Sequence, residues 1–509
     1  MDSTIMDYNL NIRAIFWRVE KLYSNQEIIS RTYEGIKRYT YRDFSLRVRK
    51  LASFLKQKGL AGERIATIAW NTHRHLELYF AVPLLNGILH TVNVRFHPTE
   101  MDYVIKEMGD KAIFKDKDIE YKNDSITSFI LDEKYDEEVE VQEPFAEFPD
   151  VDEKQGAIAC FTSGTTGKPK GVIYSHRSVF IHSLSLMAKD VLGISSSDTV
   201  MTIVPMFHIS GWDTPFASLM TGARLVLPGP RPKAEDIVNM IKSFGVTIAI
   251  AAPTVWIDVV HYVEKEKGDL SPLKAVVTGG AEPPLGLIKK LSEYGVKTYH
   301  AWGMTETEAI ATINKSDDIN RLSEQGYPIP GIETALIDVD GKELPWDGRS
   351  VGELVVRGAF VTKRYFNSPS NILHNNTWLR TGDVVKIKED GSIKVVDRLK
   401  DLIKSGGEWI SSVDLENAIM SYEKVLEAAV VGVPDEKWGE RPVAFVVKKP
   451  GVEVTEEEII NYLKSLNMFA KWQLPDKIIF IDSIPKTSTG KLDKKAMREM
   501  VKKFIEKKG

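Results

Sequence analysis

The sequence is organised around Thr162-Ser163-Gly164-Thr165-Thr166-Gly167-Lys168-Pro169-Lys170-Gly171. The three glycines of this stretch cost backbone entropy in a helix or a strand, and Pro169 removes a hydrogen-bond donor, so the stretch predicts a loop. Apolar runs at 157–161 and 172–174 indicate a turn between two strands. Successive backbone amides in such a turn, surrounded by hydroxyls and lysines, are suited to binding a phosphate.

Two other kinds of loop are rich in the same residue types. A P-loop would require glycine at position 162 and serine or threonine at position 169, where this chain has Thr162 and Pro169, so the P-loop pattern does not fit. A surface loop without a ligand has the same kind of composition. The loop alone does not distinguish that interpretation from a phosphate site.

Length and composition limit the class of protein. The 509 residues are enough for roughly two to four domains, and 43% hydrophobic with 27% charged residues is typical of a globular chain. A net charge of -4 gives no basic surface for nucleic acid or an anionic membrane. The single cysteine, Cys160, excludes an intramolecular disulfide. With no signal-peptide core and no run of about 18 apolar residues, we expect a cytoplasmic protein without a membrane span.

Strands and helices alternate along most of the chain, which is typical of an α/β fold. The acidic stretch between 115 and 153 is interpreted as a solvated face or a connecting loop. Residues 326–396 are rich in strands and turns and predict a small β subdomain, and the last hundred residues predict a compact α/β unit. The spacing of apolar residues predicts helices over 12–24, from Asp43 and over 177–192, a hairpin over 28–41, and strands at 64–70, 248–252 and 275–278.

Several short motifs follow the loop and carry groups suited to binding a nucleotide. Glu306 offers a hard oxygen for Mg²⁺, and Asp383 can accept both hydroxyls of a ribose. The adjacent glycines at 279–280 would let a flat ring approach the backbone. Taken alone, these motifs also fit a purely structural role. A lone histidine such as His208 is more often a core residue, and Gly279-Gly280 alone is an unremarkable turn.

In their fixed order, these motifs resemble the adenylate-forming superfamily, which includes acyl-CoA synthetases, firefly luciferases and the adenylation domains of peptide synthetases. Trp212, four places after His208, and the segment 402–412, LIKSGGEWISS, are closest to medium- and long-chain fatty acyl-CoA synthetases. Trp302 stands where tyrosine is common in the family, and Ala301 stands where glycine is common. The contact with adenine is therefore expected to differ in detail.

The resemblance implies an α/β fold with two domains. Residues 1–397 would form a large N-terminal domain of stacked α/β sheets that holds the acid, ATP and Mg²⁺ site, with a small β-barrel subdomain at about 326–397. Residues 398–509 would form a smaller, mobile α/β C-terminal domain, with the hinge at Lys400 and a catalytic lysine at Lys491.

The resemblance also implies a role for each matching residue. Catalysis is assigned to His208, Glu306, Lys400, Lys404 and Lys491, and the metal ligands are Thr162 and Glu306. The acid pocket is assigned to His208, Trp212, Trp256 and Gly279. Binding of ATP or CoA is assigned to Thr162, Ser163, Gly164, Thr165, Thr166, Gly167, Lys168, Gly280, Ala281, Glu282, His300, Ala301, Trp302, Gly303, Met304, Thr305, Asp383, Arg398, Gly406, Gly407 and Trp409.

The implied function is that of an AMP-forming acid–CoA ligase that uses ATP, Mg²⁺ and CoA. It would adenylate a carboxylic acid, expected to be a medium- or long-chain fatty acid, and then transfer the acyl group to CoA. The alternatives are a ligase for a short or hydroxylated acid, an adenylating enzyme that loads a separate carrier protein, and a nucleotide-binding module without chemistry. The nearest members of the superfamily dimerise through the N-terminal region, so a homodimer is one expected assembly.

Overall fold

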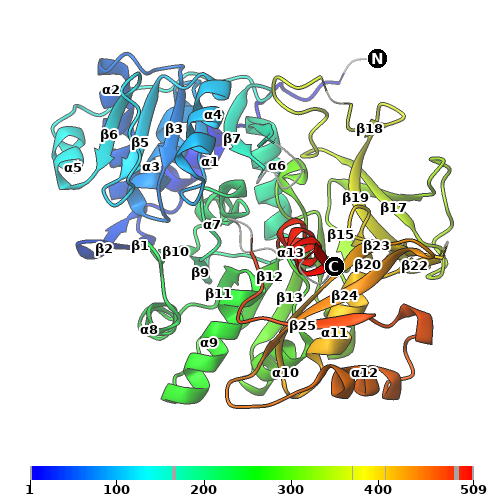
Figure 1. The fold of residues 1–509 in the computed structure, drawn as a ribbon. Helices are drawn as coiled ribbons and strands as arrows, with labels where there is room; N and C mark the ends of the chain where they lie inside the picture. The colour runs from blue at the N-terminus through cyan, green and yellow to red at the C-terminus, as the bar shows by residue number, and fades with distance from the viewer. Residues whose placement is uncertain (1–2, 163–167, 370, 407, 487–491, 507–509) are drawn as a thin grey trace. The chain divides into compact units, whose positions relative to one another are not determined.

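The structure is a computed structural model that describes residues 3–162, 168–369, 371–406, 408–486 and 492–506 (Figure 1). It contains two compact units. The larger unit contains the described residues of Met1–Gly164, Lys168–Glu333 and Arg357–Leu379, and the smaller unit contains those of Thr334–Val356 and Arg380–Gly509. Residues 380–397 thus group with the C-terminal residues, and the boundary expected at residue 397 stays a prediction.

Two sheets form the framework of the larger unit. The six-stranded sheet has the order β6-β5-β3-β4-β7-β8, and the nine-stranded sheet has the order β15-β14-β13-β12-β11-β9-β10-β1-β2. The first contains β3 (Arg64–Ile68), β4 (Ile88–Thr91), β5 (Ala112–Asp116), β6 (Thr127–Leu131), β7 (Gly156–Phe161) and β8 (Gly171–Ser175). The second contains β1 (Glu27–Thr32), β2 (Gly35–Thr40), β9 (Thr199–Thr202), β10 (Arg224–Leu227), β11 (Ile248–Ala251), β12 (Ala275–Gly279), β13 (Lys297–Trp302), β14 (Thr312–Asn314) and β15 (Tyr327–Pro328).

Several helices of the larger unit begin at a polar side chain that caps them. Thr40 and Asp43 form a capping box at the start of α2, and Ser175 caps α6 in the same way with Ser178. The α-helices are α1 (Ile12–Lys21), α2 (Tyr41–Gln57), α3 (His73–Leu84), α4 (Pro98–Met108), α5 (Glu133–Glu140), α6 (His176–Met187), α7 (Thr214–Thr221), α8 (Ala234–Phe244), α9 (Pro253–Glu266) and α10 (Leu285–Glu293). Short 3-10 turns occur at η1 (Ile209–Gly211), η2 (Thr305–Thr307) and η3 (Ile319–Arg321).

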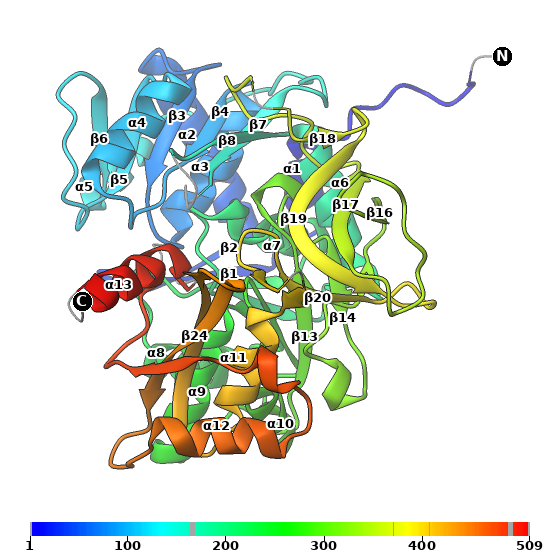
Figure 2. The ribbon, with the colours of Figure 1, turned by 45° about the vertical axis from the view of Figure 1, so that its right-hand side comes forward.

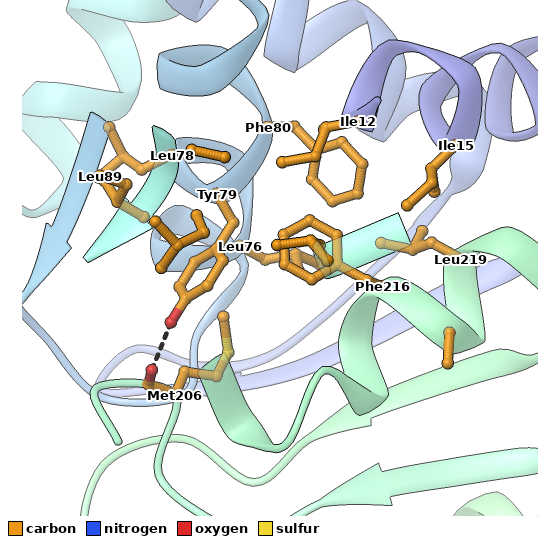
Figure 3. Packing of buried hydrophobic residues seen from close by; sticks show 14 of the residues in the cluster. Ile12, Ile15, Leu76, Leu78, Tyr79, Phe80, Leu89, Met206, Phe216 and Leu219 are labelled. Carbon is orange, nitrogen blue, oxygen red and sulfur yellow. Dashed lines mark hydrogen bonds between the residues drawn. The ribbon is translucent and has the colours of Figure 1, made fainter. Parts of the chain in front are cut away.

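The main hydrophobic core of the larger unit lies among α1, α3 and α7 (Figure 3). The ring of Phe80 on α3 packs 5.2 Å from that of Phe216 on α7, measured between centroids. Tyr79, on α3, is fully buried and donates its hydroxyl hydrogen to the carbonyl of Met206 (Figure 3). This core therefore also fixes the chain segment that follows β9.

A separate five-stranded sheet has the order β16-β17-β19-β18, with β20 paired to β19. Its strands are β16 (Ile332–Ile337), β17 (Gly352–Gly358), β18 (Leu373–His374), β19 (Trp378–Ile387) and β20 (Ile393–Arg398). The strand-rich character predicted for residues 326–396 is confirmed, whereas their division into a separate subdomain stays a prediction.

The C-terminal part of the smaller unit is a sheet of order β22-β21-β24-β23, with β25 paired to β24. Helices α11 and α12 pack against one face and α13 against the other, so that the strands are buried on both sides (Figure 2). The elements are β21 (Ile403–Ser405), β22 (Glu408–Ile410), α11 (Ser412–Met420), β23 (Val425–Asp435), β24 (Gly439–Lys448), α12 (Glu456–Ser465), η4 (Lys471–Gln473), β25 (Lys477–Phe480) and α13 (Lys494–Glu506).

Most of the predicted elements are confirmed, including the hairpin of β1 with β2 and the strands that flank residues 162–171. The interpretation of the acidic stretch was wrong in part. Residues 127–131 form β6 and residues 133–140 form α5, which buries Tyr135 and Val139. Asp136, in the same helix, pairs with two arginines of the larger unit. Within the described ranges, every helix is too short or too polar to cross a membrane.

Replacing Arg47 with methionine is expected to lower the free energy of unfolding by about 3–5 kcal/mol, the usual effect of breaking a buried ion pair. Glu77 is fully buried and lies 3.2 Å from the Arg47 guanidinium, so its carboxyl would lose its cation. Chemical denaturation of the full chain measures the loss. The exposed pair Arg38–Glu27 is the matched control, and Arg38→Met should cost only about 0–1 kcal/mol. Equal losses in the two variants would contradict this account.

Candidate active site

The loop at 162–171 is closed at its base by the antiparallel pairing of β7 with β8, in which Phe161 faces Gly171. The Thr162 amide donates to the Lys170 carbonyl at 2.9 Å, and the Lys170 amide donates to the Thr162 hydroxyl at 3.1 Å. The ammonium of Lys168 lies 5.0 Å from the centre of the Tyr103 ring. Ser163, Gly164, Thr165, Thr166 and Gly167 lie outside the described residues. The predicted turn between two strands is confirmed, whereas phosphate binding stays a prediction.

Glu306 lies just after β13, in η2, and is almost completely buried. Its Oε1 accepts the hydroxyl hydrogen of Tyr365, and its carbonyl accepts the Thr362 amide at 2.8 Å. Burial, with the nearby Glu306 carboxylate, raises the pKa of Tyr365, so this phenol stays a donor. The carbonyl of Thr305 accepts the Tyr174 hydroxyl at 2.8 Å. The Thr305–Glu306 backbone and the Glu306 carboxylate are thus held from two sides.

The segment before Glu306 depends on a glycine. A Cβ atom at Gly303 would lie 1.3 Å from the carbonyl oxygen of Ala309, so a side chain there is incompatible with this turn. On β13 itself, His300 is buried and its Nδ1 lies 2.9 Å from the Glu324 carbonyl, to which it must donate. Burial lowers the pKa of His300 to about 4, so the ring is neutral. The neighbouring Trp302, Gly303 and Met304 are partly buried.

The end of β12 lies beside the end of β13, because the two strands are parallel and Gly279 pairs with Ala301. A Cβ atom at Gly279 would lie 2.3 Å from the Ala301 carbonyl oxygen and 3.1 Å from the Trp212 indole. The structure therefore brings together three predicted site residues, Trp212, Gly279 and Ala301. Beyond them, Gly280 and Ala281 are exposed and Glu282 is partly buried.

Trp256 lies elsewhere. Its side chain is fully buried in α9, within the hydrophobic cluster that contains Val276 of β12. Trp212 belongs to the cluster that contains Val277, the next residue of the same strand. Because neighbouring residues of a strand point to opposite faces, the two tryptophans lie on opposite faces of the nine-stranded sheet. The structure does not bring Trp256 together with the other predicted pocket residues.

Trp212 is carried by a left-handed turn. Ile209, Ser210, Gly211, Trp212 and Asp213 have φ values of 45°, 52°, 62°, 59° and 54°. Two side chains from distant parts of the larger unit hold the segment in place. The Ile209 amide donates to Cys160 Sγ at 3.4 Å, and Asn71 accepts the Met206 amide at 2.7 Å. His208, which precedes the turn, is partly buried.

In the smaller unit, Asp383 and Arg398 are cross-strand neighbours on β19 and β20. The Arg398 guanidinium lies 2.5 Å from the Asp383 carboxylate, which is almost completely buried. The family resemblance implies that both residues lie in the nucleotide site, and the structure pairs them directly. Their contact with a nucleotide stays a prediction.

The segment around the predicted hinge is held by α13. The carbonyl of Lys400 accepts a hydrogen bond from Arg498, which also pairs with Asp401 at 2.7 Å. Lys404 lies 5.3 Å from the ring of Trp409, an indole that is 43% exposed. Gly406 has φ 62° and its amide donates to the Trp438 carbonyl at 2.7 Å. Gly407 and Lys491 lie outside the described residues.

The sequence does not predict a role for Lys494, because a lysine in so basic a tail has no distinguishing signal. Its ammonium is buried, 2.8 Å from Glu416 and 2.5 Å from the Ser412 hydroxyl, which donates to Asp397. Burial alone would lower the pKa of Lys494, but the carboxylates of Glu416 and Asp397 raise it. The start of the predicted hinge and the first turn of α13 are therefore joined through one buried cation.

Comparison with known proteins agrees with these features. The AMP-binding enzyme family model matches residues 16–366, and the model of the AMP-binding enzyme C-terminal domain matches residues 414–491. The chain is 38% identical to a 3-methylmercaptopropionyl-CoA ligase of Ruegeria lacuscaerulensis, covering 99% of both chains. It is 39% identical to a long-chain-fatty-acid–CoA ligase of Thermus thermophilus, covering 99% of this chain and 97% of the relative.

A solved structure has the same fold. It is o-succinylbenzoate coenzyme A synthetase from Bacillus subtilis in complex with ATP and a magnesium ion. The TM-score is 0.83 at 25% sequence identity, with 95% of this chain and 98% of that chain covered.

Replacing Gly279 with alanine is expected to displace either the Trp212 indole or the end of β13, because the new methyl group would overlap the Ala301 carbonyl. Thermal unfolding should shift to lower temperature, and the intrinsic tryptophan fluorescence should change. The matched control is Gly286→Ala, since a Cβ at Gly286 in α10 meets nothing within 4 Å. That variant should be neutral or slightly more stable. A Gly279→Ala protein with unchanged unfolding and fluorescence would contradict the close packing.

Proposed function

Because the chain belongs to the AMP-binding enzyme family and is an acid–CoA ligase, we propose that its acid substrate is a medium- or long-chain fatty acid. The observation that carries this proposal is the position of the Trp212 indole against Gly279, at the end of β12. By its resemblance to fatty acyl-CoA synthetases, Trp212 would correspond to the tryptophan that gates their acyl tunnel. The long-chain ligase of Thermus thermophilus, 39% identical to this chain, supports the same assignment.

A ligase for a short acid is the second candidate. It is favoured by the 3-methylmercaptopropionyl-CoA ligase, to which the chain is 38% identical. The identity to the long-chain enzyme, 39%, is almost the same. The third candidate is an enzyme that adenylates the acid in the same way and then transfers the acyl group to a separate carrier protein. A cytoplasmic location and a homodimer, both expected from the sequence, stay predictions.

The first half-reaction would join the acid to AMP. A carboxylate oxygen attacks the α-phosphorus of ATP, the bond from that phosphorus to the bridging oxygen breaks, and pyrophosphate leaves. In our proposal the 162–168 loop holds the phosphates, Asp383 accepts the ribose hydroxyls, and Lys491 lies between the acid carboxylate and the α-phosphate. Positive groups at these places would offset the charge that develops on the phosphate oxygens.

Two oxygens of the larger unit suit a magnesium ion. Oε1 of Glu306 accepts a hydrogen bond from Tyr365, so Oε2 is the oxygen that we propose for the metal. The hydroxyl of Thr162 is the second proposed ligand. Mg²⁺ usually binds through one or two protein oxygens plus the phosphates of a nucleotide, so these two oxygens would be sufficient protein ligands. When bound, the ion would neutralise phosphate charge.

The second half-reaction would transfer the acyl group. The CoA sulfur attacks the acyl carbonyl carbon, the bond from that carbon to the AMP oxygen breaks, and the thiol proton is lost to solvent. We propose that rotation of the residues after 397 about Lys400 withdraws Lys491 and presents the face that carries Lys404, Gly406 and Trp409. A single site would then serve both reactions while excluding water.

Chain-length specificity is tested by measuring acid-dependent AMP release, with and without CoA, over a panel of straight-chain acids from acetate to palmitate. The expected result is a maximum of kcat/KM among the medium- and long-chain acids, with AMP release strongly dependent on CoA. A maximum among the shortest acids would favour the second candidate. AMP release that needs a carrier protein in place of CoA would favour the third.

Replacing Lys491 with alanine tests the division of labour between the two half-reactions. Exchange of ATP with pyrophosphate should fall by about 10²–10³-fold, the usual loss for one charge-stabilising group. Formation of the thioester from supplied acyl-AMP should fall far less. Lys495, an exposed neighbour, provides the control, and Lys495→Ala should leave both rates unchanged. Equal losses of both half-reactions in Lys491→Ala would contradict the proposal.

A further inference from the structure

Helices α11 and α13 pack on opposite faces of the C-terminal sheet, and buried polar side chains connect them around its edge (Figure 2). Strand β23 lies at this edge, where side chains can bond to its outward amides. The amide of Val430, in β23, donates to Glu416 Oε1 of α11 at 2.8 Å. The same oxygen lies 2.8 Å from the ammonium of Lys494, at the start of α13. A cation from one face of the sheet therefore reaches a carboxylate from the other.

The Lys494 ammonium also contacts the chain around the predicted hinge. It lies 2.5 Å from the Ser412 hydroxyl, which donates to Asp397 Oδ2 at 2.6 Å. The amide of Ser412, the first residue of α11, donates to the same oxygen at 2.6 Å. Asp397 thus occupies the N-terminus of α11, where a helix has free amides and favours negative charge. Because residue 397 precedes Lys400 and residue 412 follows it, these contacts join the chain before the hinge to the chain after it.

Arg498, one helical turn after Lys494, makes a second contact with the hinge. Its guanidinium donates to the Lys400 carbonyl at 3.3 Å and lies 2.7 Å from the Asp401 carboxylate. Residues four apart in a helix lie on the same face, so both cations extend from one face of α13. Apolar packing attaches α13 to the sheet but has no direction of its own. The two cations therefore determine how the start of this helix is oriented toward the hinge.

The chain that enters α13 is the one that carries Lys491. Lys494 is only three residues beyond Lys491 in the sequence. Residues 487–491 lie outside the described residues, but Lys486 and Leu492, which flank them, form an antiparallel bridge. The two ends of that segment are thus held together directly before α13. A displacement of the first turn of α13 would displace them as well.

We propose that Lys494 is a positioning residue of the ligase, which fixes the start of α13 against the hinge and thereby determines where Lys491 is placed for adenylation. The inference rests on the proposed function for the roles of Lys491 and of the hinge. The connection itself rests on the contacts of Lys494 with Ser412 and Glu416.

The ammonium is charged in this position. Although burial acts to lower the pKa of Lys494, the nearby carboxylates of Glu416 and Asp397 raise it above its ordinary value. The side chains of Lys494 and Glu416 are only 10% and 7% exposed. A neutral residue at position 494 would remove the cation that the two carboxylates share. A buried ion pair can also serve stability alone, so the experiment must separate stability from position.

The test compares Lys494→Met with the double variant Lys494→Met/Glu416→Gln in the full chain. The single variant should unfold at a lower temperature, because a buried carboxylate loses its cation. In the double variant both members of the ion pair are neutral, and glutamine can still accept the Val430 amide hydrogen. The unfolding temperature of the double variant should therefore recover toward that of the unchanged chain.

Activity should not recover with stability. In both variants, kcat for acid-dependent exchange of ATP with pyrophosphate should fall by about 10–10²-fold, the cost of misplacing a group by about 1 Å. The KM for ATP should change little. Formation of the thioester from supplied acyl-AMP should fall far less, because Lys491 is proposed to act only in adenylation.

The matched control is Leu463→Ala. Leu463 is fully buried on α12, on the face of the sheet opposite α13. Its truncation leaves a cavity and should lower the unfolding temperature. The ratio of the two half-reaction rates should stay that of the unchanged chain.

Backbone amide hydrogen exchange, followed by mass spectrometry, tests the connection without catalysis. The amide of Ser412, bonded to Asp397, and that of Ala496, bonded to Asp493 in the first turn of α13, should exchange faster in the double variant. Amides that pair β23 with β24 should keep their protection.

Recovery of pyrophosphate exchange together with the unfolding temperature in the double variant would mean that Lys494 contributes only stability, and would overturn the proposal. Unchanged protection of the Ser412 and Ala496 amides would overturn it as well. If Lys494→Met does not fold, the double variant supplies both measurements. If the unchanged chain exchanges pyrophosphate with no acid, the proposed function fails, and amide exchange still decides whether Lys494 holds α13 against the hinge.

Discussion

The close approach of backbone to backbone at the ends of β12 and β13 is the constraint on which the candidate site depends. Side chains are excluded at Gly279, by the Ala301 carbonyl, and at Gly303, by the Ala309 carbonyl. In parallel sheets the residues that follow neighbouring strands meet at one edge, which is where such folds place their ligands. Because Gly279 has no side chain, the indole of Trp212 can lie against the end of β12. Because Gly303 has none, the chain can turn after β13 toward Glu306.

The turn that carries Trp212 has an unfavourable backbone conformation. Its four non-glycine residues in the left-handed region, Ile209, Ser210, Trp212 and Asp213, cost roughly 1–2 kcal/mol each, a total that approaches the whole stability of an ordinary domain. The compensation comes from the core, where Tyr79 bonds to the Met206 carbonyl and the segment packs among α3 and α7. Strain of this kind persists only where the surroundings determine it from several directions.

Local patterns predicted much of this arrangement. Glycines and hydroxyls at 162–171 predicted a turn between strands, and apolar spacing predicted α1, α2 and the β1–β2 hairpin, because these signals depend on residues close together in the chain. The acidic stretch was misjudged because Asp136 finds its arginine partners on α2 and α3, far away in sequence. The same distance hides the contact of Asp213 with His182 and the burial of Lys494. Of residues 209–213, Gly211 and Asp213 are of types that favour the left-handed region, and Ile209, Ser210 and Trp212 are not, so five successive left-handed residues could not be predicted.

The lone thiol of the chain lies beneath that turn. Cys160 is fully buried on β7 and accepts the Ile209 amide hydrogen, and burial raises its pKa. A thiol in such surroundings does not react with oxidants or alkylating reagents, because neither the thiolate nor a path to solvent is available. The thiol can react only after the backbone at residue 209 opens. The rate of thiol labelling in the native protein therefore reports the rate of local unfolding at this point of the fold. No added probe is needed, because the chain has a single cysteine.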